Sequence, residues 1–490
     1  MDGALSAYGC FTDFAELLTR CEGYLRGAEL SGGNMEINEI FLARMREMLG
    51  EEYPEFLSAL TEKEAVRGAR VNLIKIPDGT MPEIEGFTSR SISYVDNGYI
   101  LDGDGQVGKS AAHHAGIIYM QDPGAMSVMS ALDIEPDWWV ADLCSAPGGK
   151  SSQIAERLGE NGFLLSNEYV PKRAKIIVSN FERLGISRAI VTSLDVAEIK
   201  KLYTEVFDLV VVDAPCSGEG MLRKSEEARG EWTPEAPAMC RERQLEILRN
   251  AYSILKPGGR LVYSTCTWSI EENEEVVSTL LRELPNLEII PVKESLRVAT
   301  SDGIPYCGDE RLRMTRRCYP HITEGEGQYV ALLEKRRNDN VMTTIHYKDS
   351  IKPLSKEEEK AVREFFSSAL ISPPKARLGK HGDNIILIPH DCPIPPRSVF
   401  MGGVLVGEVR RGILYPSHHL FSAYGDLFKL KVDLSDGDNR LVAYLRGEEI
   451  ATDIEKSGWC SVRYNGASLG GGKISGGRVK NHYPKGLRNN

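Results

Sequence analysis

The sequence predicts an α/β protein whose central domain is a doubly wound sheet, mostly of parallel strands, with helices on both faces. Between about residues 115 and 335, short apolar runs alternate with segments of helical periodicity. The first of these runs leads into a glycine-rich turn, as ligand-binding α/β sheets do. The length of 490 residues exceeds what one hydrophobic core usually organises. We therefore expect two or three domains.

We expect five segments along the chain. Residues 1–34 form an N-terminal extension that ends in a glycine-rich linker. Residues 35–112 form a leading subdomain that begins with a helix, because apolar residues recur there at helical spacing before Gly50. Residues 113–335 form the central domain. A polar linker, 336–355, leads to a C-terminal region, 356–490.

Within the central domain, six apolar runs are predicted strands: 139–143, 163–167, 189–192, 207–213, 260–265 and 329–333. Helices are expected at 151–158, 171–184 and 239–254. In the C-terminal region a helix at 356–369 precedes short strand candidates at 385–388, 427–432 and 442–445, which glycine and proline interrupt. This pattern predicts a compact mixed or β-rich module.

Composition excludes several classes of protein. Hydrophobic residues make up 42% of the chain, but no apolar run approaches the roughly 20 residues that a membrane helix needs. No basic segment followed by an apolar core precedes a cleavage site, so we expect a cytoplasmic protein. The ten cysteines are sparse and none forms C-x-x-C, so we expect reduced thiols and no metal site.

A net charge of -11 argues against a nonspecific nucleic-acid binder, so local charge must carry any RNA argument. Two basic clusters are present: Arg311, Arg313, Arg316 and Arg317, and the tail residues Lys473, Arg478, Lys480, Lys485 and Arg488. Such clusters are more often solvated surface than binding sites.

The turn after the first strand is the predicted cofactor site. It reads Cys144-Ser145-Ala146-Pro147-Gly148-Gly149-Lys150, and its small residues let a ligand approach the backbone. Cys144 stands where a Walker A loop requires its first glycine, and G-x-G-x-x-G is missing. The loop therefore favours a nucleoside with a less charged tail, such as S-adenosylmethionine.

Three carboxylates follow later strands at the same sheet edge. Glu168 is placed to accept the ribose hydroxyls, Asp195 to receive the adenine amino group, and Asp213 lies beside the methionine end. Any one of them could equally be a helix cap or loop carboxylate. Their common placement favours the ligand interpretation.

Two cysteines end neighbouring strands, Cys216 after 207–213 and Cys266 after 260–265. A lone cysteine there is more often a core filler, but the pair beside a nucleoside loop favours catalysis. Cytosine C5 is too poor a nucleophile to take a methyl group until a thiolate adds at C6. A second acid or base then helps the thiol to leave. Asp213 could hydrogen-bond the cytosine edge, Lys150 could stabilise charge at O2, and the base must leave its stack.

These motifs closely resemble those of the Nol/Nop/Sun family of RNA 5-methylcytosine methyltransferases. The resemblance rests on DLCSAPGGK (142–150), DAPCSGEGM (213–221) and YSTCTWSIEENE (263–274), with RVNLIK (70–75) and YPHITEGEGQYVALL (319–333) beside them. The segments VGEVRRGILYPSHHLF (406–421) and GGRVKNHYPKGLR (476–488) are similar to the RsmF-like bacterial branch, whose tail includes a PUA-like RNA-binding module.

The resemblance implies a Rossmann-like, class I S-adenosylmethionine-dependent methyltransferase with a seven-stranded sheet, an N-terminal RNA-recognition-like α+β subdomain and a PUA-like C-terminal region. It implies that Cys266 attacks and Cys216 assists release, with Asp213 and Lys150 beside them. Cofactor contacts are implied at 144–150, Glu168, Arg173, Asp195 and Asp213. The implied substrate is 16S ribosomal RNA or the small ribosomal subunit, and we expect a monomer.

Three alternatives remain open. A nucleotide hydrolase built on Gly149-Lys150-Ser151 would bind ATP or GTP and not S-adenosylmethionine. A catalytically silent ribosome assembly factor would bind RNA without methyl transfer. A tRNA cytosine-C5 methyltransferase would share the chemistry and differ in its RNA.

Overall fold

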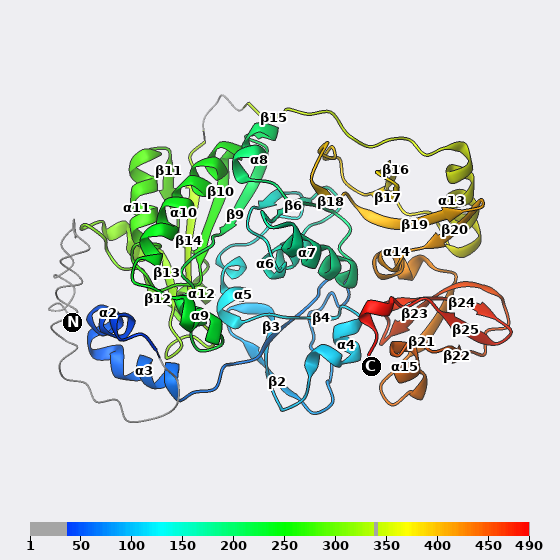
Figure 1. Ribbon diagram of the computed structural model, residues 1–490, viewed down its shortest axis with the longest axis horizontal. Coiled ribbons are helices and arrows are strands. Elements are labelled where there is room, and N and C mark those ends of the chain that lie inside the picture. The colour runs from blue at the N-terminus through cyan, green and yellow to red at the C-terminus, as the bar shows by residue number, and fades with distance from the viewer. Residues whose placement is uncertain (1–36, 338–341, 490) are drawn as a thin grey trace.

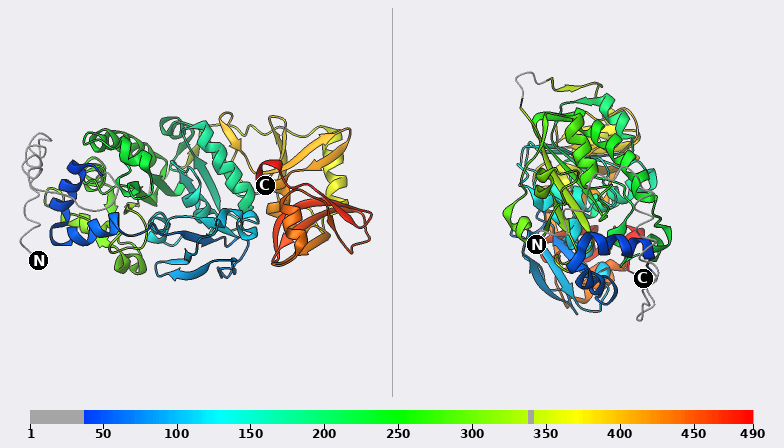
Figure 2. Two further views of the ribbon diagram at one scale, coloured as in Figure 1. Left: turned by 60° about the horizontal axis from the view of Figure 1, so that its bottom comes forward. Right: turned by 90° about the vertical axis from the view of Figure 1, so that its left-hand side faces the viewer.

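The computed structural model describes residues 37–337 and 342–489. The predicted extension, 1–34, lies outside the described residues, as do residues 338–341 of the predicted linker. Figure 1 shows an elongated molecule with the N-terminal helices at one end and the C-terminal sheets at the other, and the left view of Figure 2 agrees. No helix in the described ranges has the length and apolar character needed to cross a membrane.

A ten-stranded sheet forms the centre of the molecule. Strands β10, β9, β5, β6 and β7 run parallel. Strand β14 runs antiparallel to β10, and β13, paired antiparallel with β14, completes the expected seven-stranded arrangement. Strands β12, β11 and β18 extend it. In spatial order the strands are β12 (Ser301–Asp302), β13 (Arg316–Cys318), β14 (Gln328–Lys335), β10 (Leu255–Thr265), β9 (Phe207–Asp213), β5 (Trp139–Asp142), β6 (Phe163–Asn167), β7 (Ala189–Thr192) and β18 (Val399–Met401), with β11 (Leu287–Ile289) paired to β14.

Helices cover both faces of this sheet because its strands are apolar on both sides. In β9, Leu209 and Val211 face one core, with α6 (Gly149–Ala155) and α7 (Pro171–Leu184). The alternate residues Val210 and Val212 face the other core. Helices α8 (Val196–Leu202), α10 (Ala236–Ile254) and α11 (Glu274–Glu283) cover that side. The doubly wound arrangement predicted from the alternating pattern is confirmed.

The N-terminal region has a helical part and a sheet. Helices α2 (Glu39–Leu49) and α3 (Tyr53–Thr61) pack on the central domain through Phe41 and Phe56, whose rings contact Trp268 at centroid distances of 6.2 Å and 5.0 Å. A four-stranded sheet follows, in the order β2 (Thr88–Ile92), β3 (Val95–Asp102), β1 (Gly68–Val71) and β4 (Ile118–Met120). Strand β4 lies beyond the boundary expected at residue 112.

The C-terminal region contains two small sheets. Helix α13 (Lys356–Ala369) covers the sheet of β16 (Arg377–His381), β17 (Asn384–Ile388), β19 (Val404–Arg410) and β20 (Ile413–Pro416). The second sheet runs β21 (Leu430–Leu434), β23 (Gly458–Tyr464), β24 (Ala467–Ser475), β25 (Arg478–Asn481) and β22 (Ile450–Ala451). The C-terminal region is joined to the central domain by strand pairing, because its strand β18 pairs with β7 of the central sheet. The expected linker, 336–355, also contributes β15 (Thr344–Ile345), which pairs with β8 (Tyr203–Thr204).

One predicted strand is wrong. Residues 442–445 belong to helix α15 (Asn439–Leu445), whose first turn Asp438 caps by accepting a hydrogen bond from the backbone of Arg440. Leu441, Tyr444 and Leu445 are buried on one side, while Val442 is 52% exposed. The apolar run therefore follows helical periodicity. The candidate at 427–432 is shifted, because a 3₁₀ turn ends at Leu427 before β21 begins.

The arginine cluster at 311–317 is not a solvated basic surface. Arg317 is fully buried and forms an ion pair with the equally buried Glu274. Arg316 is buried against Asp302 and the carbonyl oxygens of Arg297 and Thr300. Burying a charge is costly unless it is paired, so these contacts show structural roles. The exposed Arg311 and the half-buried Arg313 pair with carboxylates beside them, at Asp309 and Glu310.

Candidate active site

The glycine-rich turn joins β5 to α6 at the carboxyl edge of the parallel strands. Gly148 adopts a φ of +108°, a conformation that residues other than glycine rarely adopt. Ser145 anchors the turn to the next strand, since its backbone N–H and its hydroxyl both donate to the carbonyl oxygen of Asn167, at 2.9 Å and 2.7 Å. Burial raises the pKa of the Cys144 thiol well above its ordinary value. The two hydrogen bonds of Ser145 therefore fix the turn against β6.

Lys150, the last residue of this turn, contacts Asp213 at the end of β9. Its Nζ lies 2.7 Å from Asp213 Oδ2. The hydroxyl of Ser264 donates to Asp213 Oδ1 at 2.7 Å, and Gln328 Nε2 lies 3.3 Å from the same oxygen. Burial alone would lower the pKa of Lys150, but the charge and hydrogen bond of Asp213, together with nearby Cys266 and Asp142, outweigh burial and make the net shift upward. Lys150 and Asp213 form an ion pair at the carboxyl edge of the sheet.

The other predicted cofactor residues lie in two different environments. Glu168 is buried, accepts from the backbone of Val170 at 3.0 Å and lies 3.5 Å from Arg173. Arg173 also donates to the carbonyl oxygen of Ala146 at 3.1 Å, so it joins Glu168 to the turn. Asp195, in contrast, is exposed and caps α8 through the backbone of Ala197 at 2.8 Å. This is the capping alternative that the sequence left open.

The two cysteines face one another. Cys216 Sγ lies 3.1 Å from Cys266 Sγ, and the backbone N–H of Cys266 donates to Cys216 Sγ at 3.3 Å. The two cysteines come together because β9 and β10 are neighbouring parallel strands, with Asp213 and Ser264 paired in register at their ends. The hydrogen bond with Cys266, together with burial, raises the pKa of the Cys216 thiol well above its ordinary value. Cys216 therefore carries its proton at neutral pH.

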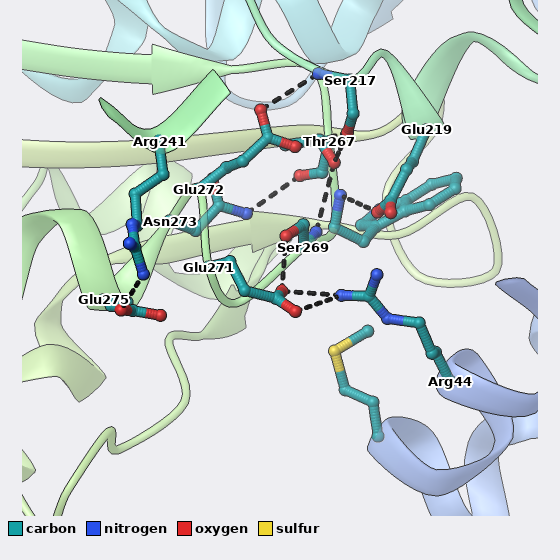
Figure 3. A network of polar contacts seen from close by, with 12 residues as sticks. Arg44, Ser217, Glu219, Arg241, Thr267, Ser269, Glu271, Glu272, Asn273 and Glu275 are labelled. Carbon is teal, nitrogen blue, oxygen red and sulfur yellow. Dashed lines mark hydrogen bonds and ion pairs between the residues drawn. The ribbon is translucent and has the colours of Figure 1, made fainter. Parts of the chain in front are cut away.

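Sequence reasoning missed the acidic residues that follow Cys266. Figure 3 shows them in a polar network around the loop of 267–273. Arg44 of α2 reaches Glu271 at 2.6 Å, and the buried Glu272 accepts from the backbone of Ser217 at 3.0 Å. The signal lay in the motif YSTCTWSIEENE, where three glutamates follow a buried strand end.

Asp142 was also missed, although it ends β5. It accepts from the hydroxyl of Ser151 at 2.6 Å, whereas its Oδ1 is buried with no hydrogen-bond partner among the described residues. Such an orphaned oxygen is costly unless a ligand satisfies it. Burial raises the pKa of Asp142 to about 7.

This raised pKa predicts a pH-dependent stability. The folded chain binds the Asp142 proton more tightly than the unfolded chain, whose pKa is near 3.8. The resulting stabilisation is complete below that value and is lost as the pH rises through about 7. We expect Asp142→Asn to flatten the decline in unfolding free energy between pH 5 and pH 8 by about 3 kcal/mol. Urea denaturation at pH 5 and pH 8 measures it, and an equal decline in both proteins would contradict this assignment.

Three family models match the chain. Residues 129–334 match 16S rRNA methyltransferase RsmB/F, residues 37–123 match the N-terminal domain of 16S rRNA methyltransferase RsmF, and residues 429–489 match the methyltransferase RsmF PUA domain. Together they cover the N-terminal region, most of the central domain and the last small sheet. The stretch between residues 335 and 428 lies outside all three matches.

Similar proteins and structures agree with these matches. Ribosomal RNA small subunit methyltransferase F of Aeromonas salmonicida is 32% identical over 86% of this chain and 90% of its own, and that of Klebsiella pneumoniae is 30% identical over 92% and 96%. A methyltransferase homologue from Pyrococcus horikoshii aligns with a TM-score of 0.52 and 26% identity over 61% of this chain and 96% of its own. NSun6 from Pyrococcus horikoshii with SFG, at 19% identity over 61% of this chain and 98% of its own, has a TM-score of 0.52 and shares the fold. The chain therefore belongs to the RsmF family of S-adenosylmethionine-dependent methyltransferases.

Proposed function

We propose that this protein methylates C5 of cytosine in 16S ribosomal RNA through a covalent bond between Cys266 and C6, which Cys216 helps to break. The observation that carries the proposal is the 3.1 Å contact between the two sulfurs, close to the Lys150–Asp213 pair. The relatives named above are small-subunit ribosomal RNA methyltransferases, which supports this substrate. An enzyme with this substrate acts in the cytoplasm.

The residues present fit S-adenosylmethionine. The unpartnered Oδ1 of Asp142 is a buried acceptor of the kind an ammonium group satisfies, and the cofactor carries one. The turn of 144–150 would hold its methionine part, and the buried Glu168, steadied by Arg173, would accept the ribose hydroxyls. Asp195 remains the proposed partner of adenine. When bound, the cofactor supplies a methyl group on a positively charged sulfur.

The reaction begins at Cys266. Its thiolate bonds to C6 of cytosine, the electron pair of the C5–C6 bond moves to C5, and C5 becomes nucleophilic enough to take the methyl group. Asp213, held by Lys150 and Ser264, would hydrogen-bond the N3/N4 edge of the base. Lys150 would stabilise the charge that develops at O2.

Release requires a proton donor, and Cys216 supplies one. Its raised pKa keeps the thiol protonated beside Cys266. As the C6–S bond breaks, Cys216 passes its proton to the departing sulfur. The Cys216 thiolate that remains then takes the proton from C5, which restores the aromatic ring and the Cys216 thiol. The net proton gained from C5 therefore ends on Cys266, whose thiol must lose it to solvent before the next attack.

RNA binding is proposed for one face of the last sheet. Trp459, Lys473 and Lys480 are paired across β23, β24 and β25, so their side chains form one row. Lys473 Nζ lies 5.8 Å from the Trp459 ring centre, and both lysines are exposed. An aromatic ring at one end of a row of exposed lysines suits a base and its phosphates. Arg478, Lys485 and Arg488 belong to the same tail, where Arg478 pairs with Glu449 and Arg488 donates to the carbonyl oxygen of Tyr483.

Reversing the charge of Lys473 and Lys480 is therefore expected to weaken RNA binding. We expect the double change to glutamate to reduce affinity about tenfold to a hundredfold and to lower the salt slope by about two. Deleting everything after Gly472 is a poor test, because it removes part of β24 and all of β25. Filter binding at several salt concentrations provides the measurement.

A matched control reverses Lys200 and Lys201, two exposed lysines on α8. This change alters net charge by the same amount at a distant place. Cofactor affinity should be unchanged in both double variants. Equal RNA affinity in the two would refute the proposed surface.

The product and the RNA class are tested together. Nuclease digestion and mass spectrometry of RNA methylated in vitro should yield 5-methylcytidine. Bisulfite sequencing of total RNA from cells lacking the protein should show loss of modification in 16S ribosomal RNA. Loss in tRNA would favour the tRNA alternative. RNA binding without methyl transfer would favour an assembly factor, and the family assignment already argues against a nucleotide hydrolase.

A further inference from the structure

The residues on either side of Cys216 are held by one buried carboxylate, Glu272, and by a glutamine that binds this carboxylate. Glu272 accepts from the backbone N–H of Ser217, directly after Cys216, and also from the Ser217 hydroxyl. On the other side, Gln244 donates to the carbonyl oxygen of Pro215, directly before Cys216, at 3.0 Å. The same Gln244 nitrogen donates to Glu272 at 2.8 Å. Glu272 and Gln244 thus hold both neighbours of Cys216.

The carboxylate itself is fixed to the segment that carries Cys266. Glu272 lies on the loop after β10, and the hydroxyl of Tyr263 donates to its carbonyl oxygen at 2.5 Å. Its side chain is fully buried, and burial raises its pKa to about 7. A buried carboxyl is costly, and three donors from the Cys216 side offset that cost. Figure 3 shows the Glu272 side chain reaching from the segment before α11 to Ser217.

We propose that Glu272 is a positioning residue that holds Cys216 against Cys266 and so sets the rate at which the methylated RNA is released. Among the described residues no hydrogen bond joins the Glu272 carboxylate to either sulfur, so it holds Cys216 in place through Ser217 and Gln244. The inference rests on the proposed function, because it assumes that the sulfur pair forms and breaks the bond to C6. A displacement of about 1 Å at Cys216 would slow proton transfer far more than the earlier attack by Cys266.

Removing the side chain should separate the two half-reactions. We expect Glu272→Ala to form the covalent RNA adduct at a rate within about threefold of the wild type, but to release product about tenfold to a hundredfold more slowly. Glu272→Gln keeps an acceptor oxygen for Ser217 and Gln244, so its release rate should stay within about threefold. Rapid-quench single-turnover kinetics with labelled RNA on a denaturing gel measures both rates.

The matched control is Glu275→Ala. Glu275 lies three residues further along and pairs with Arg241 at 2.5 Å, away from the Cys216 segment. It should not accumulate adduct. A Glu272→Ala protein that releases product as fast as this control would overturn the proposal, as would one that loses attack and release equally. If Glu272→Ala does not fold, Gln244→Ala provides the test. Accumulation of adduct in this variant supports the positioning of Cys216 by Glu272 and Gln244, and normal release overturns it.

The double variant Cys266→Ala with Glu272→Ala separates this proposal from the proposed function. No adduct should form in it. If adduct still forms, the nucleophile is misassigned and the proposed function fails, whatever Glu272 does. If adduct disappears while Glu272→Ala alone releases normally, only the positioning role is overturned.

Discussion

Cys266→Ala should abolish methyl transfer. Without the thiolate, no bond to C6 can raise the electron density at C5, so we expect turnover to fall by at least about a thousandfold. The cofactor turn should be unaffected, because Cys266 lies on a different strand end from residues 144–150. Transfer of a labelled methyl group to RNA measures the loss, and calorimetry checks that cofactor affinity is retained.

Two further substitutions sharpen this result. Cys307→Ala removes an exposed cysteine and should leave turnover unchanged. Cys266→Ser retains a nucleophile of nearly the same size, but its hydroxyl is almost fully protonated at neutral pH, so activity should still be lost. Undiminished methylation by the serine variant would contradict the assignment of the nucleophile.

Cys216→Ala should trap the enzyme on its RNA. Cys266 can still attack and the methyl group can still transfer, but the proton donor 3.1 Å from the departing sulfur is gone. We expect a covalent protein–RNA complex to accumulate to nearly one per enzyme, while multiple turnover falls by about a hundredfold or more. A denaturing gel with labelled RNA shows the complex as a shifted band.

Two controls apply to the Cys216→Ala adduct: proteolysis of the shifted band, and the same substitution in a protein that also carries Cys266→Ala. Digestion of the shifted band should leave the label on a peptide, and Cys216→Ala combined with Cys266→Ala should give no band. Normal turnover of Cys216→Ala without an adduct would show that another group resolves the bond.

The central sheet was predictable because its strands carry strong local signals. The runs at 163–167, 189–192 and 207–213 match β6, β7 and β9 as observed. They are continuous apolar segments, bounded by turn residues, of the kind that parallel strands buried on both faces require. The run at 442–445 is equally apolar, yet it forms a helix because Asp438 caps it and one side packs in a core. Four apolar residues alone do not distinguish the two.

The positions of the two cysteines were predictable for a topological reason. Each follows a strand, and the carboxyl ends of neighbouring parallel strands meet at one edge of a sheet. The contact between Lys150 and Asp213 follows from the same rule. Their chemical roles remain predictions.

Partners that come from distant segments could not be predicted. Glu272 meets Ser217 across 55 residues, and Arg317 meets Glu274 across 43. In the sequence, Arg317 looks like part of a basic surface, and only the fold shows that a buried carboxylate neutralises it. Asp195 illustrates the opposite case, since its position after β7 suits both a ligand contact and the helix cap that it forms.

The most direct test of the account uses RNA in which 5-fluorocytidine replaces cytidine. Fluorine at C5 cannot leave as a cation, so the ring cannot regain its aromaticity and the bond to the enzyme persists after methyl transfer. Mass spectrometry of the digested complex should place the methylated nucleotide on the peptide that contains Cys266. A nucleotide attached to any other residue, or methylation of normal RNA with no complex on the fluorinated RNA, would contradict the account.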